Sequence, residues 1–119
     1  MRWAHLIDLH CTTCPEEPEF GRSECHAWSA LPMYELLRSV AGIRSGGIGW
    51  SQVLVTPHTD DVPDIKGRAV TPKGSILFNY RQENGRWVYE LTLPAGLSGS
   101  FVYPDGRRVA LYEGKNRLI

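Results

Sequence analysis

The sequence predicts a mainly β protein, an antiparallel β-sandwich preceded by two short helical segments. Three observations support this prediction. Before Gly42 the apolar residues recur at steps of three and four, which is the spacing of one face of a helix. After Trp50 they alternate with polar residues, as in a strand with one buried face. Turn-forming residues separate the alternating runs at short intervals, as in a sandwich of short strands.

Two helical segments are expected before the sandwich. Trp3, Leu6, Ile7 and Leu9 indicate a short helix at the start of the chain. A second, amphipathic helix is expected from Ala27 to Ala41. Pro32 lies near its start, where the missing N–H costs least, and Gly42 is expected to end it. The apolar stripe of this helix consists of Trp28, Leu31, Tyr34, Leu37 and Ala41, widened by Leu36 and Val40.

The remainder of the chain is predicted to form strands and turns. Asn84-Gly85 is the strongest hairpin signal, and Pro104-Asp105-Gly106 supplies a second turn. We expect Gly46, Gly47 and Gly49 to form a flexible hinge, with a helical segment over 1–45 and a β-sandwich domain over 46–119. The expected strands are Gln52–Thr56, Gly67–Thr71, Ser75–Gln82, Trp87–Leu93, Gly99–Tyr103, Val109–Tyr112 and one more near the C-terminus.

Composition and charge exclude several classes of protein. The 119 residues include 13 basic and 13 acidic ones, so no charge excess would drive binding to nucleic acid or to an anionic membrane. No apolar run is long enough to span a bilayer. His5, Asp8 and His10 interrupt the N-terminal apolar stretch, which therefore does not resemble a signal peptide. Three cysteines are too few for a disulfide framework, and we expect a cytoplasmic protein.

The reactive side chains gather in the first thirty residues and allow two cysteine-based chemistries. Cys11 and Cys14 have zinc-ligand spacing, and Cys25 or His26 would supply a third ligand. The second half of a zinc motif is missing, so we expect neither a metal nor another cofactor. Cys25 beside His26 suggests a thiol nucleophile, but neighbouring side chains point apart on a helix and no third orienting residue is evident.

Carboxylate chemistry is the third alternative, with Glu16 as a base on an open loop and His26 as a substrate-binding donor. Taken alone, the loop glutamates Glu16, Glu17 and Glu19 are more often a solvated acidic surface than a catalytic site. A single histidine at a helix start is likewise more often a structural residue. The residue types by themselves therefore leave the three alternatives open.

A family resemblance changes that balance. RSECHAWSALPMYELLRSVAGIR, residues 22–44, resembles the RSDCHAWSA-type segment of bacterial α-L-rhamnosidases, and ECHAWSA with the Gly-Ile-Arg exit is its specific part. TTCPEEPE, residues 12–19, resembles the family's threonine-opened loop that carries a glutamate. GIGWSQVLVTPHTDDVPDIKGRAVTPKGSI and YELTLPAGLSGSFVYPDGRRVALYEGKNRL resemble the family's C-terminal β-sandwich. The resemblance covers essentially the whole chain.

The resemblance implies inverting hydrolysis of terminal α-L-rhamnose in an (α/α)6 barrel that precedes the sandwich. Glu16, three residues after Thr13, occupies the position of the general base, and His26 that of a sugar-binding histidine. Trp28 either contacts the sugar or is a core residue, and we favour the core. The family's general acid lies upstream in the barrel, and nothing in these residues replaces it. The resemblance thus implies a structural, accessory C-terminal module that is inactive alone.

Two kinds of partner and one alternative function follow. A missing barrel chain or a second copy would cover the apolar face of the helices, and the ligand would be a rhamnoside or another carbohydrate. The alternative is a stand-alone carbohydrate-binding or protein-interaction domain whose aromatic residues stack on sugars. We expect these residues to be mainly sandwich core. They are Trp50, Tyr80, Trp87, Tyr89 and Tyr103.

Overall fold

The chain consists of two compact units, Met1–Glu35 and Leu36–Ile119. The computed structural model describes residues 3–17 and 23–119, so Glu19 of the acidic loop lies outside the described residues. The division predicted at residues 45 and 46 falls within a hairpin of the second unit.

The first unit is small and helical. Helix α1 spans Trp3–Asp8, as expected from the apolar spacing at the start of the chain. A 3₁₀ turn, η1, spans Ala27–Ala30, and helix α2 spans Leu31–Glu35. The indole Nε1–H of Trp3 donates a hydrogen bond of 2.8 Å to the carbonyl of the fully buried Ser29. This bond ties the N-terminal helix to the second helical segment.

The second helical segment differs from the single α-helix expected over Ala27–Ala41. It begins with the 3₁₀ turn η1, continues as α2, and ends as a π-helical turn, η2, over Leu36–Val40 in the second unit. Pro32 explains the first change, because it has no N–H to donate to the Trp28 carbonyl four residues earlier. The N–H of Leu31 bonds that carbonyl instead, which is 3₁₀ spacing. At the other end the N–H of Ala41 bonds the Leu36 carbonyl, five residues earlier.

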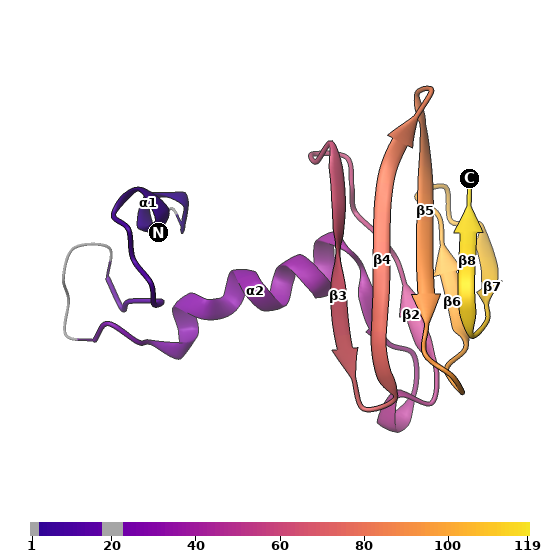
Figure 1. The fold of residues 1–119 in the computed structure, drawn as a ribbon, viewed down its shortest axis with the longest axis horizontal. Coiled ribbons are helices and arrows are strands. Elements are labelled where there is room, and N and C mark those ends of the chain that lie inside the picture. Colours follow the sequence, from indigo (N-terminus) through magenta and orange to yellow (C-terminus); the bar gives the residue numbers. More distant parts are fainter. Residues whose placement is uncertain (1–2, 18–22) are drawn as a thin grey trace. The chain divides into compact units, whose positions relative to one another are not determined.

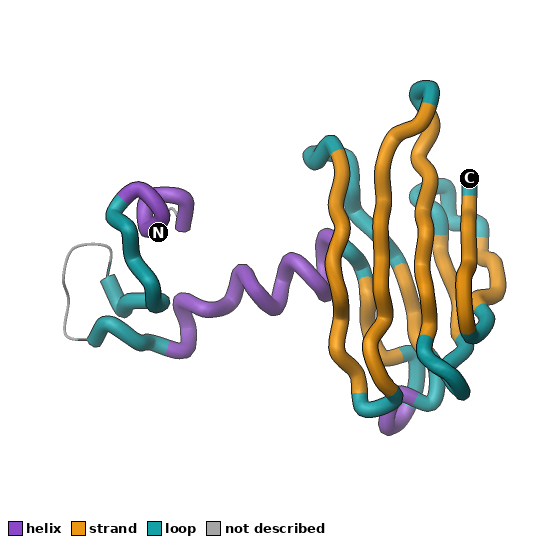
Figure 2. The backbone as a smooth tube through the Cα atoms, in the orientation of Figure 1, coloured by secondary structure: helices purple, strands orange, loops and turns teal. Residues whose placement is uncertain are grey.

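Two four-stranded sheets pack face to face in the second unit (Figures 1 and 2). One has the order β3-β4-β5-β8 and the other β1-β2-β6-β7. The predicted sandwich is therefore confirmed. The strands are β1 Ile43–Ser45, β2 Val53–Val55, β3 Asp64–Thr71, β4 Gly74–Glu83, β5 Arg86–Leu93, β6 Gly99–Val102, β7 Arg108–Leu111 and β8 Gly114–Leu118.

Two features of the β1-containing sheet were not anticipated. Strand β1 pairs antiparallel with β2, and the Gly46 N–H donates to the Gln52 carbonyl at 2.8 Å. The glycine-rich segment is thus the loop of a hairpin, with a 3₁₀ turn at Ile48–Trp50, and the expected hinge is wrong. Strands β2 and β6 pair in parallel within an otherwise antiparallel sheet. Their close approach needs Gly99, where a Cβ would lie 1.9 Å from the Val53 carbonyl oxygen.

Both predicted turns are present. Asn84 and Gly85 have φ values of 50° and 76° and connect β4 to β5, with Glu83 paired to Arg86. Positive φ at both central residues gives the turn a twist that matches the strands. In the Pro104–Gly106 turn the Gly106 N–H donates to the Tyr103 carbonyl at 2.9 Å.

The core lies between the two sheets and extends to the end of the helical segment. Inward-facing residues of both sheets form it, and Leu37 of η2 packs against it. The buried hydroxyl of Tyr80 donates to the carbonyl of Ala41 at 3.2 Å, just after η2. Burial raises the pKa of Tyr80 far above its ordinary value, and the nearby Tyr89 adds a smaller increase. This hydroxyl therefore stays a donor.

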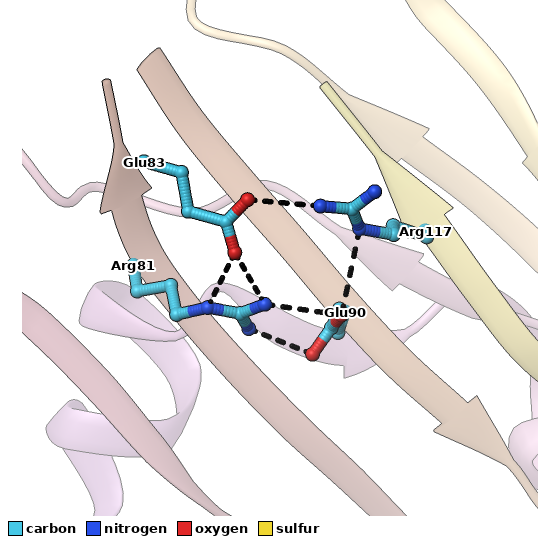
Figure 3. A network of polar contacts seen from close by, with 4 residues as sticks. All are labelled: Arg81, Glu83, Glu90 and Arg117. Atoms are coloured by element: carbon cyan, nitrogen blue, oxygen red, sulfur yellow. Dashed lines mark hydrogen bonds and ion pairs between the residues drawn. The ribbon is translucent and has the colours of Figure 1, made fainter. Parts of the chain in front are cut away.

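A charged network covers part of the outward face of the β3-β4-β5-β8 sheet (Figure 3). Arg81 on β4 bonds Glu90 on β5, with Nη1 and Oε2 2.7 Å apart. Arg117 on β8 bonds Glu83 on β4, with Nη2 and Oε2 2.9 Å apart. The hydrogen bond from Arg81 lowers the pKa of Glu90 below its ordinary value. The network joins three neighbouring strands, and its charges are paired with one another.

Candidate functional site

The residues predicted from the rhamnosidase resemblance lie in the first unit, where two hydrogen bonds bring their segments together. The N–H of His26 donates to the carbonyl of Cys14 at 2.6 Å, and the N–H of Glu16 donates to the carbonyl of Ser23 at 2.9 Å. The loop that carries Glu16 therefore runs beside the entry to the second helical segment. The backbones of Glu16 and His26 belong to one small paired region, although ten positions separate them in the sequence.

His26 is the residue that precedes η1, and its backbone is anchored. Its carbonyl accepts a bond from the N–H of Ser29 at 3.2 Å and another from the Ser29 hydroxyl at 2.8 Å. Its half-buried imidazole lies edge-on to the indole of Trp28, with the ring centroids 6.0 Å apart and the planes at 76°. The imidazole of His26 and the indole of Trp28 therefore form one group on a fixed turn.

Trp28 is not a core residue in this chain. Its side chain is 51% exposed, so the expectation that it packs into a core is wrong here. The physical reason is that the described residues of the first unit form no second layer over the indole. Among its described residues, only Leu6, Pro15 and Ser29 are buried. An exposed indole beside a histidine leaves Trp28 available to contact a ligand or a partner chain.

Glu16 is half-buried on the loop beside this group. A carboxylate in this position has the chemistry of a general base, and the imidazole of His26 has that of a hydrogen-bond donor. Together with Trp28 they would form one side of a sugar site. The roles of these three residues remain predictions.

The described residues do not support a zinc site or a thiol nucleophile at the cysteines. Within residues 3–17 and 23–119, no three His, Cys, Asp or Glu side chains are grouped so as to hold a metal ion. Cys11 and Cys25 are exposed free thiols, and Cys14 is a half-buried one. The helices of the described residues are too short to cross a membrane.

The predicted apolar stripe of the helical segment is largely exposed. Only its C-terminal part, Leu37 and Ala41, packs against the sandwich core. The exposed large apolar side chains of the segment are Trp28, Leu31, Met33, Tyr34 and Leu36.

The aromatic residues of the sandwich are mostly core, as expected. Tyr80, Tyr89 and Tyr103 are buried, whereas Trp50 and Trp87 are partly buried against the core. Arg107 was not among the predicted site residues, and its guanidinium carbon lies 3.8 Å from the centroid of the Tyr103 ring. Arg86 and Arg107 each follow the glycine of a predicted turn, but that position alone does not indicate a ring contact.

Residues 42–117 match the sequence model of the bacterial alpha-L-rhamnosidase C-terminal domain. The chain belongs to this family. The match begins at Gly42 and covers the sandwich, so Glu16, His26 and Trp28 lie before it. The rhamnosidase resemblance of the sequence is therefore confirmed for the sandwich.

Solved structures extend the likeness to the helical segment that precedes this domain. The alpha-L-rhamnosidase of Aspergillus terreus matches 98% of the chain, with a TM-score of 0.81 and 17% identity. That of Streptomyces avermitilis, in complex with L-rhamnose, matches 97% with a TM-score of 0.80 and 20% identity. A rhamnosidase of Bacillus sp. GL1 matches 87% with a TM-score of 0.76 and 27% identity. No curated protein matches the chain.

The chain spans a small part of these enzymes, 15%, 14% and 12% of their respective lengths. Its described residues hold the C-terminal sandwich and a helical segment, and no (α/α)6 barrel. A sandwich and a helical segment without the barrel are consistent with an accessory role in a rhamnosidase-like protein.

Proposed function

We propose that the chain is the accessory C-terminal module of a rhamnosidase-type glycoside hydrolase. Its sandwich supports the barrel that performs catalysis, and its helical segment completes that barrel. The match of residues 42–117 to the rhamnosidase C-terminal domain carries this proposal. The structural likeness over 97–98% of the chain supports including the helical segment.

Glu16 and His26 would form one side of the sugar site. By the resemblance, Glu16 activates the water that attacks the sugar, and His26 donates a hydrogen bond to a sugar hydroxyl. Inversion also needs a carboxylic acid across the ring, about 6.5–9.5 Å from the base, to protonate the leaving oxygen. We propose that this acid belongs to the barrel, whether the barrel lies in the same longer protein or in a separate chain. The module alone then binds and orients but does not cleave.

The exposed apolar side chains of the helical segment support a partner that covers them. In the proposed enzyme, barrel helices cover Leu31 and Tyr34. Without them, we expect a second copy to take their place, because burying apolar surface contributes about 25 cal/mol per Å2. The isolated chain should therefore self-associate at micromolar concentration.

Light scattering after size-exclusion chromatography tests this surface. We expect an oligomer for the unaltered chain and a shift toward monomer for Leu31→Ser. Leu77→Ser is the matched control. Leu77 and Leu31 are almost equally exposed, at 51% and 52%, but Leu77 lies on β4 and Leu31 on the helical segment. A monomer for the unaltered chain at tens of micromolar, or equal effects of the two variants, would contradict the proposed surface.

A further inference from the structure

A hollow of about 330 Å3 opens at one end of the sandwich, away from the helical segment's point of attachment. Residues from β5, from the turn after β6 and from the end of β8 form it. By strand order it lies toward the β7 and β8 edges, whereas η2 contacts β1 at the opposite edge. The lining residues are Arg86, Trp87, Tyr89, Tyr103, Pro104, Asp105, Arg107 and Ile119.

Aromatic rings form the walls of this hollow. The rings of Trp87 and Tyr89 are stacked, with centroids 6.0 Å apart and planes at 20°. Tyr103 meets Tyr89 edge-on at 6.1 Å, and its hydroxyl donates to the carbonyl of Ile119 at 3.4 Å. Tyr89 and Tyr103 are buried in the core, so the rings are held in place before any ligand arrives. Trp87 is only partly buried and offers apolar surface to a ligand.

The charged side chains that line the hollow are Arg86, Arg107 and Asp105. The guanidinium of Arg107 lies over the Tyr103 ring, and Arg86 precedes Trp87 at the start of β5. Among the residues that the structure describes, neither guanidinium forms an ion pair. Asp105 is the one acidic lining residue, and its Oδ1 already accepts a 2.9 Å bond from the Arg107 N–H. Two arginines and one aspartate thus line the hollow, and the carboxylate of the aspartate caps its own turn.

We propose that this hollow binds an acidic saccharide. The C–H groups of a pyranose ring would pack against Trp87, as apolar ring surface does against an aromatic side chain. The sugar's carboxylate would bond the guanidiniums of Arg86 and Arg107, whose planar forks match a carboxylate. The volume lies at the lower end of the range for ligand pockets, about 300–1,000 Å3, which suits a single sugar unit. The proposal does not depend on the accessory role of the module.

NMR titration of the whole chain with sodium D-glucuronate tests the proposal. We expect a saturable shift of the Trp87 indole N–H and of the Arg107 side-chain N–H, with the Trp87 signal assigned from Trp87→Phe. D-Glucose supplies the ring without the charge, and sodium acetate supplies the charge without the ring. Both should bind more weakly than glucuronate. No saturable shift with glucuronate, or an equal shift with acetate, would overturn the proposal.

Charge-matched variants separate the site from general electrostatics. Arg107→Gln and Arg86→Gln should each weaken glucuronate binding by about tenfold, the effect of losing one charge-assisted hydrogen bond. Arg108→Gln removes the same charge one residue along the chain, and Arg108 does not line the hollow. It should leave binding unchanged. Equal weakening by Arg107→Gln and Arg108→Gln would overturn the assignment, and Arg86→Gln provides the same comparison if Arg107→Gln fails to fold.

Discussion

Gly42→Ala introduces one methyl group where the helical segment enters the sandwich. The new Cβ would lie 2.0 Å from the carbonyl oxygen of Thr56 and 2.5 Å from the nitrogen of Pro57. Both atoms belong to the backbone after β2, so no side-chain rotation relieves the overlap. The backbone must shift, and the bond from the Thr56 N–H to the Gly42 carbonyl, 2.9 Å long, would be strained or lost.

The expected cost has two separable parts. Gly42 has a φ of 72°, and a non-glycine residue in this region costs about 1–2 kcal/mol. The hydrogen bond contributes about 0.5–1.5 kcal/mol, and displacement of the packed β1–β2 pair adds to it. We therefore expect a loss of about 3 kcal/mol or more. Gly96→Ala is the matched control, because Gly96 has a φ of 73° with nothing within 4 Å of its would-be Cβ. Gly96→Ala should therefore show only the cost of about 1–2 kcal/mol for the positive φ.

Urea unfolding of both variants, followed by near-ultraviolet circular dichroism, measures the two losses. The difference between the variants should be about 2 kcal/mol, which corresponds to a Tm difference of about 8–16 °C for a domain of this size. Equal destabilisation by Gly42→Ala and Gly96→Ala would refute the argument that close backbone contact at Thr56 requires this glycine.

Two further predictions concern the core and the charged network. Tyr80→Phe leaves the buried Ala41 carbonyl without its 3.2 Å donor and should cost about 1–2 kcal/mol in urea unfolding. Tyr112→Phe, at an exposed position, should have no effect, and equal losses would count against a role for the Tyr80 hydroxyl. Glu90→Gln should lower the thermal stability near neutral pH. The pKa of Glu90 is lowered in the folded protein by the bond from Arg81, so its carboxylate contributes stability above its ordinary pKa. That contribution is lost as the pH falls through the folded pKa, and the Tm gap between Glu90→Gln and the unaltered chain should close in acid. A gap that stays constant from neutral to acidic pH would contradict the pairing.

Local patterns in the sequence predicted most of the sandwich. Alternation and turn residues locate β4, β5 and the Asn84-Gly85 hairpin, because each depends on neighbouring residues. The pattern missed β1, since three residues between glycines carry too little alternation to be distinguished from a loop. It also missed the parallel pairing of β2 with β6. Those strands are distant in sequence, and their pairing depends on the absence of a Cβ at Gly99.

The candidate sites show the same limit. The resemblance identified Glu16 and His26, but only the backbone bonds from their N–H groups to the carbonyls of Ser23 and Cys14 show that their segments lie together. The prediction for Trp28 was wrong because an apolar helical stripe does not reveal whether a second layer covers it. Arg86 and Arg107 come from different hairpins, and nothing local in the sequence indicates that both reach the same hollow.

Hydrolysis of 4-nitrophenyl α-L-rhamnoside by the purified chain tests the central proposal most directly. In the proposed function, the accessory module holds the base, Glu16, and the opposing acid belongs to the barrel. The unaltered chain and Glu16→Gln should therefore release 4-nitrophenol no faster than buffer. Release by the unaltered chain that Glu16→Gln abolishes would contradict this account, because the chain would then contain a complete catalytic site.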